Sequence, residues 1–314
     1  MNSLDSLYLN KKVLVTGASG FIGRHLLARL YNSGANVNTI SRKRCDFQLE
    51  IGQFILDICD EKAVRDCVLE CQPDYIFHLA AYKERSTTVE SLYTSIETNL
   101  IGSLNLFSAA KDMGLVKSII TLGTAEEYGI NSLPFCENMR ESPATSYSFS
   151  KLCVSNLSEL FWRLYDFPVT IIRPTLAYGP GQGIDMFLPA LIISLRDNKK
   201  FNMTFGNQTR DFVYVEDLVE ALLVSSQTSF SKGQIINIGS GKTVKLSEIA
   251  YMVEKIMGKI GLVCLGGHPY RNNEVMDYYV DINKAKDLLN WNVKTPLDVG
   301  LQKTIAYYCG EKED

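Results

Sequence analysis

The sequence lacks an excess of positive charge. It carries 32 lysines and arginines against 35 aspartates and glutamates, which gives a formal net charge of -3. Proteins that bind nucleic acid through its phosphates usually show a clear basic excess, so this balance argues against a nucleic-acid-binding protein. Local clusters of basic residues remain compatible with it.

Long apolar runs are missing too. No stretch approaches the roughly 20 apolar residues that cross a bilayer, so no membrane span is expected. The opening residues show no positive segment leading into an apolar one, so no secretory signal is expected either. Cys67 and Cys71 lie one helical turn apart without nearby histidines, and we interpret them as helix residues rather than metal ligands. No metal site is expected, and eight scattered cysteines fit a reducing, cytoplasmic setting.

What the chain does contain is an alternation of short apolar runs with helix-period segments through its first 240 residues. Continuous apolar strands separated by helices are typical of a parallel sheet covered on both faces. Right-handed crossovers then predict an α/β fold with a doubly wound parallel sheet. The expected strands are 13–16, 37–41, 54–57, 75–79, 118–123, 169–173 and 235–238. The expected helices lie near 22–33, 61–70, 90–113, 146–166 and 212–226.

From Pro174 onward this rhythm loosens into glycine, proline and shorter elements. The pattern predicts two domains. The first contains the sheet and spans residues 1–173 plus 211–239. The second is smaller and discontinuous, and spans residues 174–210 plus 240–314.

A glycine pattern follows the first expected strand. The chain reads Gly17-Ala-Ser-Gly20-Phe-Ile-Gly23 between that strand and the first helix. Glycines at this spacing permit a tight turn, close approach of the backbone to a pyrophosphate and close helix–strand packing. The helix start adds N–H groups and a positive dipole end for the phosphates. A purely structural turn is the alternative, but the position after the first strand favours a dinucleotide site.

The end of the second expected strand bears on the cofactor. NAD-binding proteins usually place an Asp or Glu about 20 residues beyond the glycines, where it accepts from the ribose 2′-hydroxyl. This chain instead reads Thr39-Ile-Ser41-Arg42-Lys-Arg44, with three cations and no carboxylate. Ser41 and Arg42 can hydrogen-bond a 2′-phosphate, so NADP(H) is favoured over NAD(H). The alternative interpretation is a solvated basic loop.

Tyr147 and Lys151 lie four residues apart, which places both on one face of the helix expected over 146–166. Such a pair alone is common on protein surfaces. Thr124, at the end of the expected strand 118–123, and the glycine pattern add to it. With these features together, the sequence resembles the extended short-chain dehydrogenase/reductase family, in its nucleotide-sugar branch.

The resemblance extends over nearly the whole chain. It implies an NAD(P)-dependent oxidoreductase with a dinucleotide-binding first domain and a second domain that binds a nucleotide sugar. Further matching segments are Asp57-Ile58, His78-Leu-Ala-Ala81, Asn99-Leu-Ile-Gly102, Tyr128-Gly129, Arg173-Pro174, Tyr178-Gly-Pro-Gly181, Arg210-Asp-Phe-Val-Tyr-Val-Glu-Asp217, Asn237-Ile-Gly239 and Asp281-x-x-Lys-Ala…Leu-Leu-Asn-Trp291.

The resemblance also implies roles by position. Tyr147 matches the tyrosine that exchanges a proton with the sugar oxygen, and Thr124 matches the hydroxyl that bonds the same oxygen. Lys151 matches the lysine that holds the nicotinamide ribose and lowers the tyrosine pKa. Arg210 and Arg271 match arginines that hold the substrate diphosphate. The implied cofactor contacts are Gly17, Gly20, Phe21, Ile22, Gly23, Ser41, Arg42, Asp57, Ile58, Leu79, Ala80, Ala81, Lys83, Asn99, Tyr147 and Lys151.

The segment after Thr124 bears on the reaction. Relatives that act as 4,6-dehydratases on deoxythymidine-diphosphate sugars have an Asp–Glu pair there, whereas this chain has Ala125 and Glu126. Alanine cannot donate the proton that the elimination needs. Glu126 stays a further catalytic and substrate-binding candidate. The run Glu-Glu-Tyr-Gly is similar to that of 4-keto-6-deoxy nucleotide-sugar reductases, and Leu176 departs from an Asn that often binds the diphosphate in the family.

These implications predict NADPH-dependent reduction of the C4 keto group of a nucleoside-diphosphate 4-keto-6-deoxyhexose. A redox-neutral 4-epimerase or 4,6-dehydratase is the alternative, and a non-catalytic cofactor-binding protein of the same fold is a third. We assign no histidine to catalysis, and His78, at the end of a buried strand, is interpreted as structural. By analogy with the family, a homodimer is expected through the helices near 90–113 and 146–166, with apolar Leu157, Leu160, Phe161 and Leu164 on adjoining turns.

Overall fold

Seven parallel strands form the central sheet of the protein. The computed structural model describes residues 4–84, 88–270 and 274–310. The strand order is β11-β6-β5-β4-β1-β2-β3, and every neighbouring pair is parallel. The predicted doubly wound α/β sheet is therefore confirmed. The strands are β1 (Lys12–Thr16), β2 (Asn36–Ser41), β3 (Gly52–Ile55), β4 (Tyr75–His78), β5 (Ser118–Leu122), β6 (Val169–Pro174) and β11 (Ile235–Ile238).

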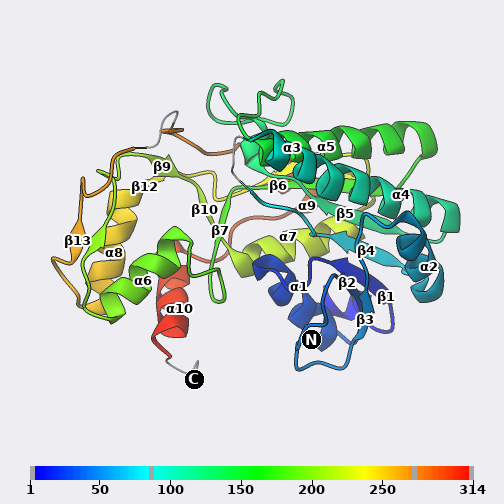
Figure 1. Cartoon of the computed structure of the whole chain (residues 1–314), viewed down its shortest axis with the longest axis horizontal. Coiled ribbons are helices and arrows are strands. Elements are labelled where there is room, and N and C mark those ends of the chain that lie inside the picture. Colours follow the sequence, from blue (N-terminus) through cyan, green and yellow to red (C-terminus); the bar gives the residue numbers. More distant parts are fainter. Residues whose placement is uncertain (1–3, 85–87, 271–273, 311–314) are drawn as a thin grey trace.

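Helices cover both faces of this sheet (Figure 1). Their apolar stripes meet the strands in two separate clusters of buried side chains, one on each face. One face carries α1 (Phe21–Asn32), α7 (Val215–Gln227) and α9 (Asn283–Leu289). The other carries α2 (Glu61–Cys71), α4 (Gly102–Met113) and α5 (Ser146–Tyr165).

The strand order places the chain's polar loops at one edge of the sheet. β1 lies between β2 and β4, so the crossovers leaving β1 and β4 run in opposite directions. A crevice opens outside the carboxyl ends of the strands at such a point, and ligands of doubly wound sheets bind there. The loops that follow β1, β4 and β5 meet at this edge.

Two expected elements differ from those observed. The helix expected near 90–113 is divided into α3 (Val89–Ser95), a π-helical turn (Ile96–Ile101) and α4. The third strand is β3 rather than 54–57, so Asp57 follows the strand instead of ending it. Asp57 accepts a hydrogen bond from the Cys59 N–H at 2.9 Å, and such local side-chain bonds favour a turn over a strand.

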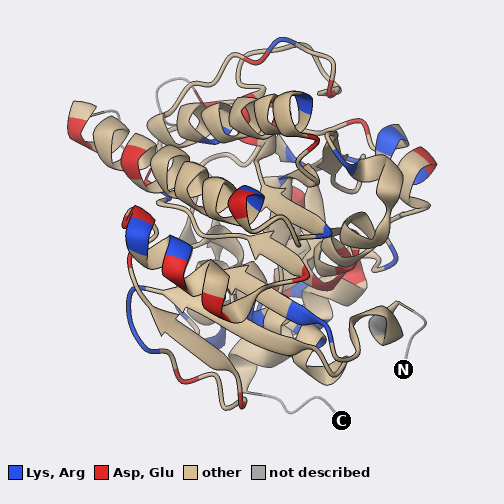
Figure 2. Cartoon of the chain, turned by 90° about the vertical axis from the view of Figure 1, so that its right-hand side faces the viewer, with Lys and Arg blue, Asp and Glu red and all other residues tan. Residues whose placement is uncertain are grey.

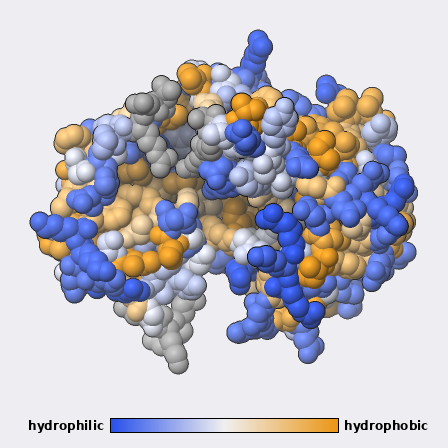
Figure 3. All heavy atoms as spheres, viewed as in Figure 1, coloured by the Kyte–Doolittle hydropathy of each residue, from blue (hydrophilic) through white to orange (hydrophobic). Residues whose placement is uncertain are grey.

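A smaller lobe contains three helices that pack on one another, α6 (Phe187–Arg196), α8 (Leu246–Met257) and α10 (Leu297–Cys309). Figure 1 shows this lobe beside the sheet, and the space-filling view is hollowed between the two (Figure 3). Its short strands pair two by two: β7 (Leu176–Tyr178) with β10 (Phe212–Tyr214), β9 (Thr209–Arg210) with β12 (Val244–Lys245), and β8 (Phe201–Asn202) with β13 (Val263–Cys264).

The predicted domain bounds stay a prediction, and one segment does not follow them. Residues 283–293 were expected in the second domain, but Ala285, Leu289 and Trp291 are buried in the core of the large sheet. The Trp291 indole N–H also donates to the Asp217 carbonyl on α7 at 3.1 Å. The chain therefore returns to the first lobe a second time before it ends with α10 in the small one.

Charges of both signs alternate over the helices that cover the sheet (Figure 2). The near-neutral total thus reflects a mixed surface rather than one basic and one acidic half. The cation-rich sequence at 42–44 stands out within that mixture.

Candidate active site

The glycine turn lies directly against the loop that follows β4. Gly17 has a φ of +73°, and a Cβ added to it would lie 2.6 Å from the Ala80 nitrogen. A Cβ on Gly23 would lie 2.2 Å from the Gly17 carbonyl oxygen. Gly20 is the N-cap of α1 and has no side chain to occupy the helix N–H groups. The turn therefore keeps its backbone open in the way that a dinucleotide pyrophosphate requires.

A chain of hydrogen bonds fixes the loop after β4. The Ala80 N–H donates to the Thr16 hydroxyl at 3.1 Å, and that hydroxyl lies 2.7 Å from His78 Nδ1. His78 Nε2 lies 2.8 Å from the Ser103 hydroxyl, which donates to the Asn99 carbonyl. One assignment satisfies every atom: Thr16 donates to Nδ1, and Nε2–H donates to Ser103. Burial lowers the pKa of His78 to about 3, so His78 is a neutral structural residue.

Asn99 holds the same loop from the other side. Its Oδ1 accepts from the Tyr82 N–H at 2.6 Å, and its Nδ2 donates to the Tyr82 carbonyl and to the Ser150 hydroxyl at 3.0 and 2.8 Å. These bonds tie the loop after β4 to α5. The structure shows that Asn99 fixes Tyr82, which lies between Leu79–Ala81 and the exposed Lys83. A direct contact of Asn99 with a cofactor stays a prediction.

The loop after β5 carries Thr124 into a short 3₁₀ turn, Ala125–Glu127. Thr124 is the N-cap of this turn: its hydroxyl accepts from the Glu126 N–H at 3.2 Å, and its own N–H donates to Glu127 Oε1 at 2.8 Å. Reciprocal bonds of this kind form a capping box. Thr124 is buried, so the turn fixes its side chain at the carboxyl edge of the sheet.

Tyr147 and Lys151 lie on the inner face of α5, as their spacing predicts. Their side chains are 9% and 2% exposed. Thr145 begins the helix with another capping box, which it shares with Ser148. Burial lowers the pKa of Lys151 to about 8, and the negative charge of Glu127 opposes that shift. α5 packs against the 3₁₀ turn, so the structure brings the turn that follows Thr124 next to the helix that carries Tyr147 and Lys151.

Two buried charges lie next to this site, and no role was assigned to either from the sequence, although both stand in segments that match the family. Glu127 and Arg173 are both fully buried, and the guanidinium nitrogens Nε and Nη2 lie 2.8 and 2.7 Å from Glu127 Oε2. Glu141 accepts from Nη2 at 2.7 Å, and the guanidinium lies 4.7 Å from the Tyr128 ring. An arginine at the end of an apolar strand and a glutamate in a turn both look like surface residues in sequence alone.

Tyr278 is a further residue that sequence reasoning missed. It lies in an irregular segment far along the chain, and its ring meets that of Phe135 edge-on at 5.7 Å. Burial raises its pKa well above the usual value, and the nearby charges of Glu126 and Asp211 raise it further. Tyr278 therefore keeps its proton and lies close to Glu126 and Tyr147. The sequence around Tyr278 has no helix or strand periodicity that would have indicated its position.

The structure describes one of the two predicted substrate arginines. Arg210 lies in β9, and its Nη2 donates to Glu274 at 2.6 Å while Nη1 donates to the Thr209 carbonyl at 2.7 Å. Both side chains of the ion pair are mostly buried. Arg271 lies outside the described residues.

The cations after β2 are exposed, as the sequence suggests. The Ser41 hydroxyl donates to the Lys43 carbonyl at 2.7 Å. Arg42 lies between these two residues and is exposed. Arg24 of α1 links the glycine turn to this loop, because it donates to the Ser19 carbonyl at 3.0 Å and lies 5.8 Å from the Phe47 ring. Arg24 is thus a basic residue near the predicted phosphate site that the sequence pattern did not single out.

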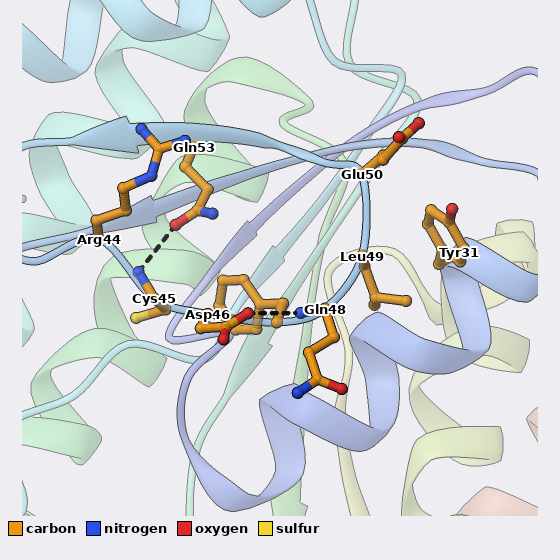
Figure 4. Close-up of a pocket in the computed structure, with 9 residues that line it drawn as sticks. Tyr31, Arg44, Cys45, Asp46, Gln48, Leu49, Glu50 and Gln53 are labelled. Carbon is orange, nitrogen blue, oxygen red and sulfur yellow. Dashed lines mark hydrogen bonds between the residues drawn. The ribbon is translucent and has the colours of Figure 1, made fainter.

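A hollow of about 740 Å³ is lined by the loop between β2 and β3 and by the end of α1. Figure 4 shows its lining side chains, with Tyr31 from α1 and the others from residues 44–53. The Cys45 N–H donates to Gln53, and the Gln48 N–H donates to Asp46, both at 3.0 Å. These local bonds shape the loop, and the charges of Arg44, Asp46 and Glu50 point in different directions. The hollow has no cluster of converging polar groups.

The predicted cofactor contacts Asp57 and Ile58 lie in the turn that follows β3. Ile58 is buried, and a Cβ on Gly102 would lie 2.6 Å from its Cγ2. Asn105 donates to the Ile58 and Cys59 carbonyls at 3.0 and 3.1 Å. These contacts fix the turn that carries the exposed Asp57 carboxylate.

Within residues 4–84, 88–270 and 274–310, no group of three or more His, Cys, Asp or Glu residues is arranged to hold a metal ion. No helix in the same ranges is long and apolar enough to span a membrane.

Known proteins resemble this chain over almost its full length. A UDP-glucuronate 4-epimerase of Thermodesulfobacterium geofontis is 27% identical over 94% of this chain and 95% of its own. A UDP-N-acetyl-alpha-D-glucosaminuronate decarboxylase of Bacillus cytotoxicus is 30% identical over 96% and 98%. The structure of a UDP-glucose 4-epimerase from Thermotoga maritima with UDP-glucose superimposes with a TM-score of 0.87, at 27% identity over 94% and 98%. Residues 13–239 match the NAD dependent epimerase/dehydratase family, and the chain belongs to that family.

Proposed function

We propose that this protein is an enzyme that acts on a nucleoside-diphosphate sugar, with hydride transfer at C4 of the sugar. One observation supports the proposal: the turn that carries buried Thr124 packs against α5, which carries buried Tyr147 and Lys151, and both this turn and the glycine turn follow the carboxyl ends of central strands. A bound nicotinamide cofactor supplies or accepts the hydride. The relatives named above act on sugars linked to UDP, which supports the substrate class.

The chain's own residues move the proton. Tyr147 donates to the sugar oxygen during reduction and accepts from it during oxidation. The Lys151 ammonium stabilises the tyrosine anion and holds the nicotinamide ribose. Thr124 hydrogen-bonds the same sugar oxygen and orients it. In this proposal Arg210, with Arg271, contacts the diphosphate, and Glu126 and its neighbour Tyr278 contact the sugar.

Within this class we propose NADPH-dependent reduction of a 4-keto-6-deoxyhexose. Ala125 supports this choice, because it leaves the turn after Thr124 without the acid that a 4,6-dehydratase uses. The cations at 42–44 support NADPH as the reductant. A reductase consumes NADPH in proportion to the sugar converted, so incubation with a 4-keto sugar nucleotide should lower absorbance at the nicotinamide band until one reactant is exhausted.

A redox-neutral 4-epimerase is the second candidate, and the names of the relatives favour it. Such an enzyme recycles its cofactor. It would convert UDP-sugars into their C4 epimers with no net change in NADPH or NAD. Product analysis by mass spectrometry and proton NMR separates the two candidates in one experiment.

The cofactor preference gives a prediction. Arg42→Ala should raise the Kd for NADPH about tenfold or more, because a charge-assisted hydrogen bond to the 2′-phosphate is lost. The Kd for NADH should change little, since NADH lacks that phosphate. Fluorescence titration with both cofactors measures this, and the NADH titration is the matched control. Equal affinity of the unaltered protein for the two cofactors would contradict the NADP preference, which the family's NAD-dependent description leaves open.

We also propose a homodimer through α3, α4 and α5. Leu160, Leu164 and Tyr165 of α5 are exposed apolar side chains, and Tyr93 of α3 is 73% exposed. Leu157 and Phe161, which were expected on the same surface, instead face the core of the sheet, because they lie one turn apart on the inner face of α5. The outer stripe that remains is still apolar enough to pack against a second copy.

The dimer predicts a change in mass after a single substitution. Leu164→Glu should halve the molar mass measured by light scattering at micromolar concentration, because it places a charge in the interface. Ile260→Glu is the control, since Ile260 is similarly exposed but lies at the end of α8 in the small lobe. A monomeric unaltered protein at that concentration would exclude the proposal.

A further inference from the structure

The Glu127 carboxylate joins three elements that surround the candidate active site. Its Oε1 accepts from the Thr124 N–H at 2.8 Å. Its Oε2 accepts from the Ser155 hydroxyl at 2.8 Å and from Arg173, whose Nη2 lies 2.7 Å away. Thr124 belongs to the turn after β5, Ser155 to α5 and Arg173 to β6. One side chain thus bonds to groups from all three elements.

The bond to Ser155 has a particular place on α5. Ser155 lies one helical turn after Lys151 and two turns after Tyr147, on the same inner face. The bond between Glu127 and Ser155 therefore fixes the position of α5 along its own axis relative to the Thr124 turn. Gly123 allows the close approach, because a Cβ there would lie 2.6 Å from Glu127 Oε1.

Glu127 also controls the charge around Lys151. Among the described residues, the ionisable groups that interact with that ammonium are Glu127 from the turn and neutral His78 from β4. Arg173 on β6 is the cation paired with Glu127, and it is shared with Glu141. Glu127 is thus the negative group that opposes the desolvation of Lys151.

We propose that Glu127 is a positioning residue, which holds the Thr124 turn in register with Tyr147 and Lys151 through its bonds to Thr124, Ser155 and Arg173. The inference rests on the proposed function, in which Thr124, Tyr147 and Lys151 act together. Glu127 itself is fully buried. Its effect passes through the bond to Thr124 and through its charge.

The decisive variant is Glu127→Gln, which keeps the size and one oxygen but removes the charge. The amide has one acceptor oxygen where the carboxylate has two, so its N–H₂ group must face either the Thr124 N–H or the Arg173 guanidinium, and the link between the turn and its neighbours is weakened. We expect kcat to fall on the order of 10–100-fold because the reacting groups lose their register. We also expect Lys151 to titrate at lower pH than the wild-type value of about 8. NMR of ¹³Cε-labelled lysine, assigned with Lys151→Met, measures that titration without turnover.

Two further variants sharpen the test. Glu141→Gln removes a carboxylate from the same arginine but touches neither Thr124 nor Ser155, so the Lys151 titration should stay at the wild-type value. Ser155→Ala keeps the charge and removes one hydrogen bond, so kcat should fall while Lys151 titrates as in the wild type. If Glu127→Gln does not fold, Ser155→Ala decides the positioning role by its kcat alone.

The outcomes separate the two proposals. Unchanged Lys151 titration and unchanged kcat in Glu127→Gln would overturn the inference and leave the proposed function standing. A shifted titration in a protein that turns over no nucleotide sugar would support the electrostatic role of Glu127 and reject the proposed function. Wild-type kcat in Ser155→Ala would overturn the positioning role.

Discussion

Tyr147→Phe should lose most turnover while its affinity for the cofactor stays near the wild-type value. The substitution removes only the phenolic oxygen, and the ring stays packed on the inner face of α5. Without that oxygen, no group donates the proton to the sugar oxygen as the hydride arrives. Loss of a general acid or base typically costs about 10²–10⁴-fold in rate. Steady-state assays with NADPH and a keto sugar nucleotide measure the loss.

The control for this variant is Tyr128→Phe. Tyr128 is another buried tyrosine near the site, but its hydroxyl donates to Asn237 at 2.7 Å and has a structural role. Its removal should leave kcat close to the wild-type value and lower stability by about 1 kcal/mol, the usual worth of one hydrogen bond. Wild-type turnover in Tyr147→Phe would remove Tyr147 from the mechanism.

Arg173→Met should lower the free energy of unfolding by about 3–5 kcal/mol, which is the usual cost of breaking a buried ion pair from one side. The variant leaves Glu127 fully buried without its cation. The methionine fills most of the space but offers no donor to that carboxylate or to Glu141. Urea unfolding followed by circular dichroism measures the change.

The loss in Arg173→Met should depend on pH. Burial already raises the pKa of Glu127 in the folded protein, and Arg173 opposes that rise. Without the arginine the folded-state pKa rises further above the unfolded value. The folded state then binds the extra proton at low pH, so the variant loses stability as pH increases through the window between the two values. The deficit should be smallest in acid and largest at neutral pH.

A matched control for charge removal is Arg65→Met. Arg65 forms an ion pair with Asp112 at 2.8 Å, but both side chains are about half exposed. Exposed pairs contribute about 0–1 kcal/mol, so this variant should unfold near the wild-type urea midpoint at every pH. If the two variants lost equal free energy of unfolding, burial would not explain the contribution of the Arg173–Glu127 pair to stability.

The sheet was predictable because its signals are local. Apolar runs such as 118–123 and the glycines after β1 identify strands and a turn within a few residues of sequence. Their order then fixes which loops share the carboxyl edge, and this is why Thr124 and Tyr147 could be placed near the glycine turn. The position of Tyr147 and Lys151 on one helix face followed from their spacing alone.

The remaining parts of the site depend on contacts between distant residues. The pairing of Glu127 with Arg173 spans 46 positions, and nothing in either local sequence indicates that these charges are buried. Arg210 was predicted for a diphosphate, but only the structure shows Glu274 as its partner. The same holds for Tyr278, which reaches the site from an irregular segment without periodicity.

The packing of α9 on the sheet also determines when this protein can finish folding during its synthesis. Trp291 is buried against α7, and α9 covers β11, so the first lobe cannot complete its core until residues 283–291 have been made. Until position 291 has left the ribosome, apolar surface of α7 stays open to water. Until then such a nascent chain is exposed to aggregation and to chaperones. A premature stop before residue 291 would therefore release a chain that has all seven strands of the sheet but an incomplete apolar core on one face.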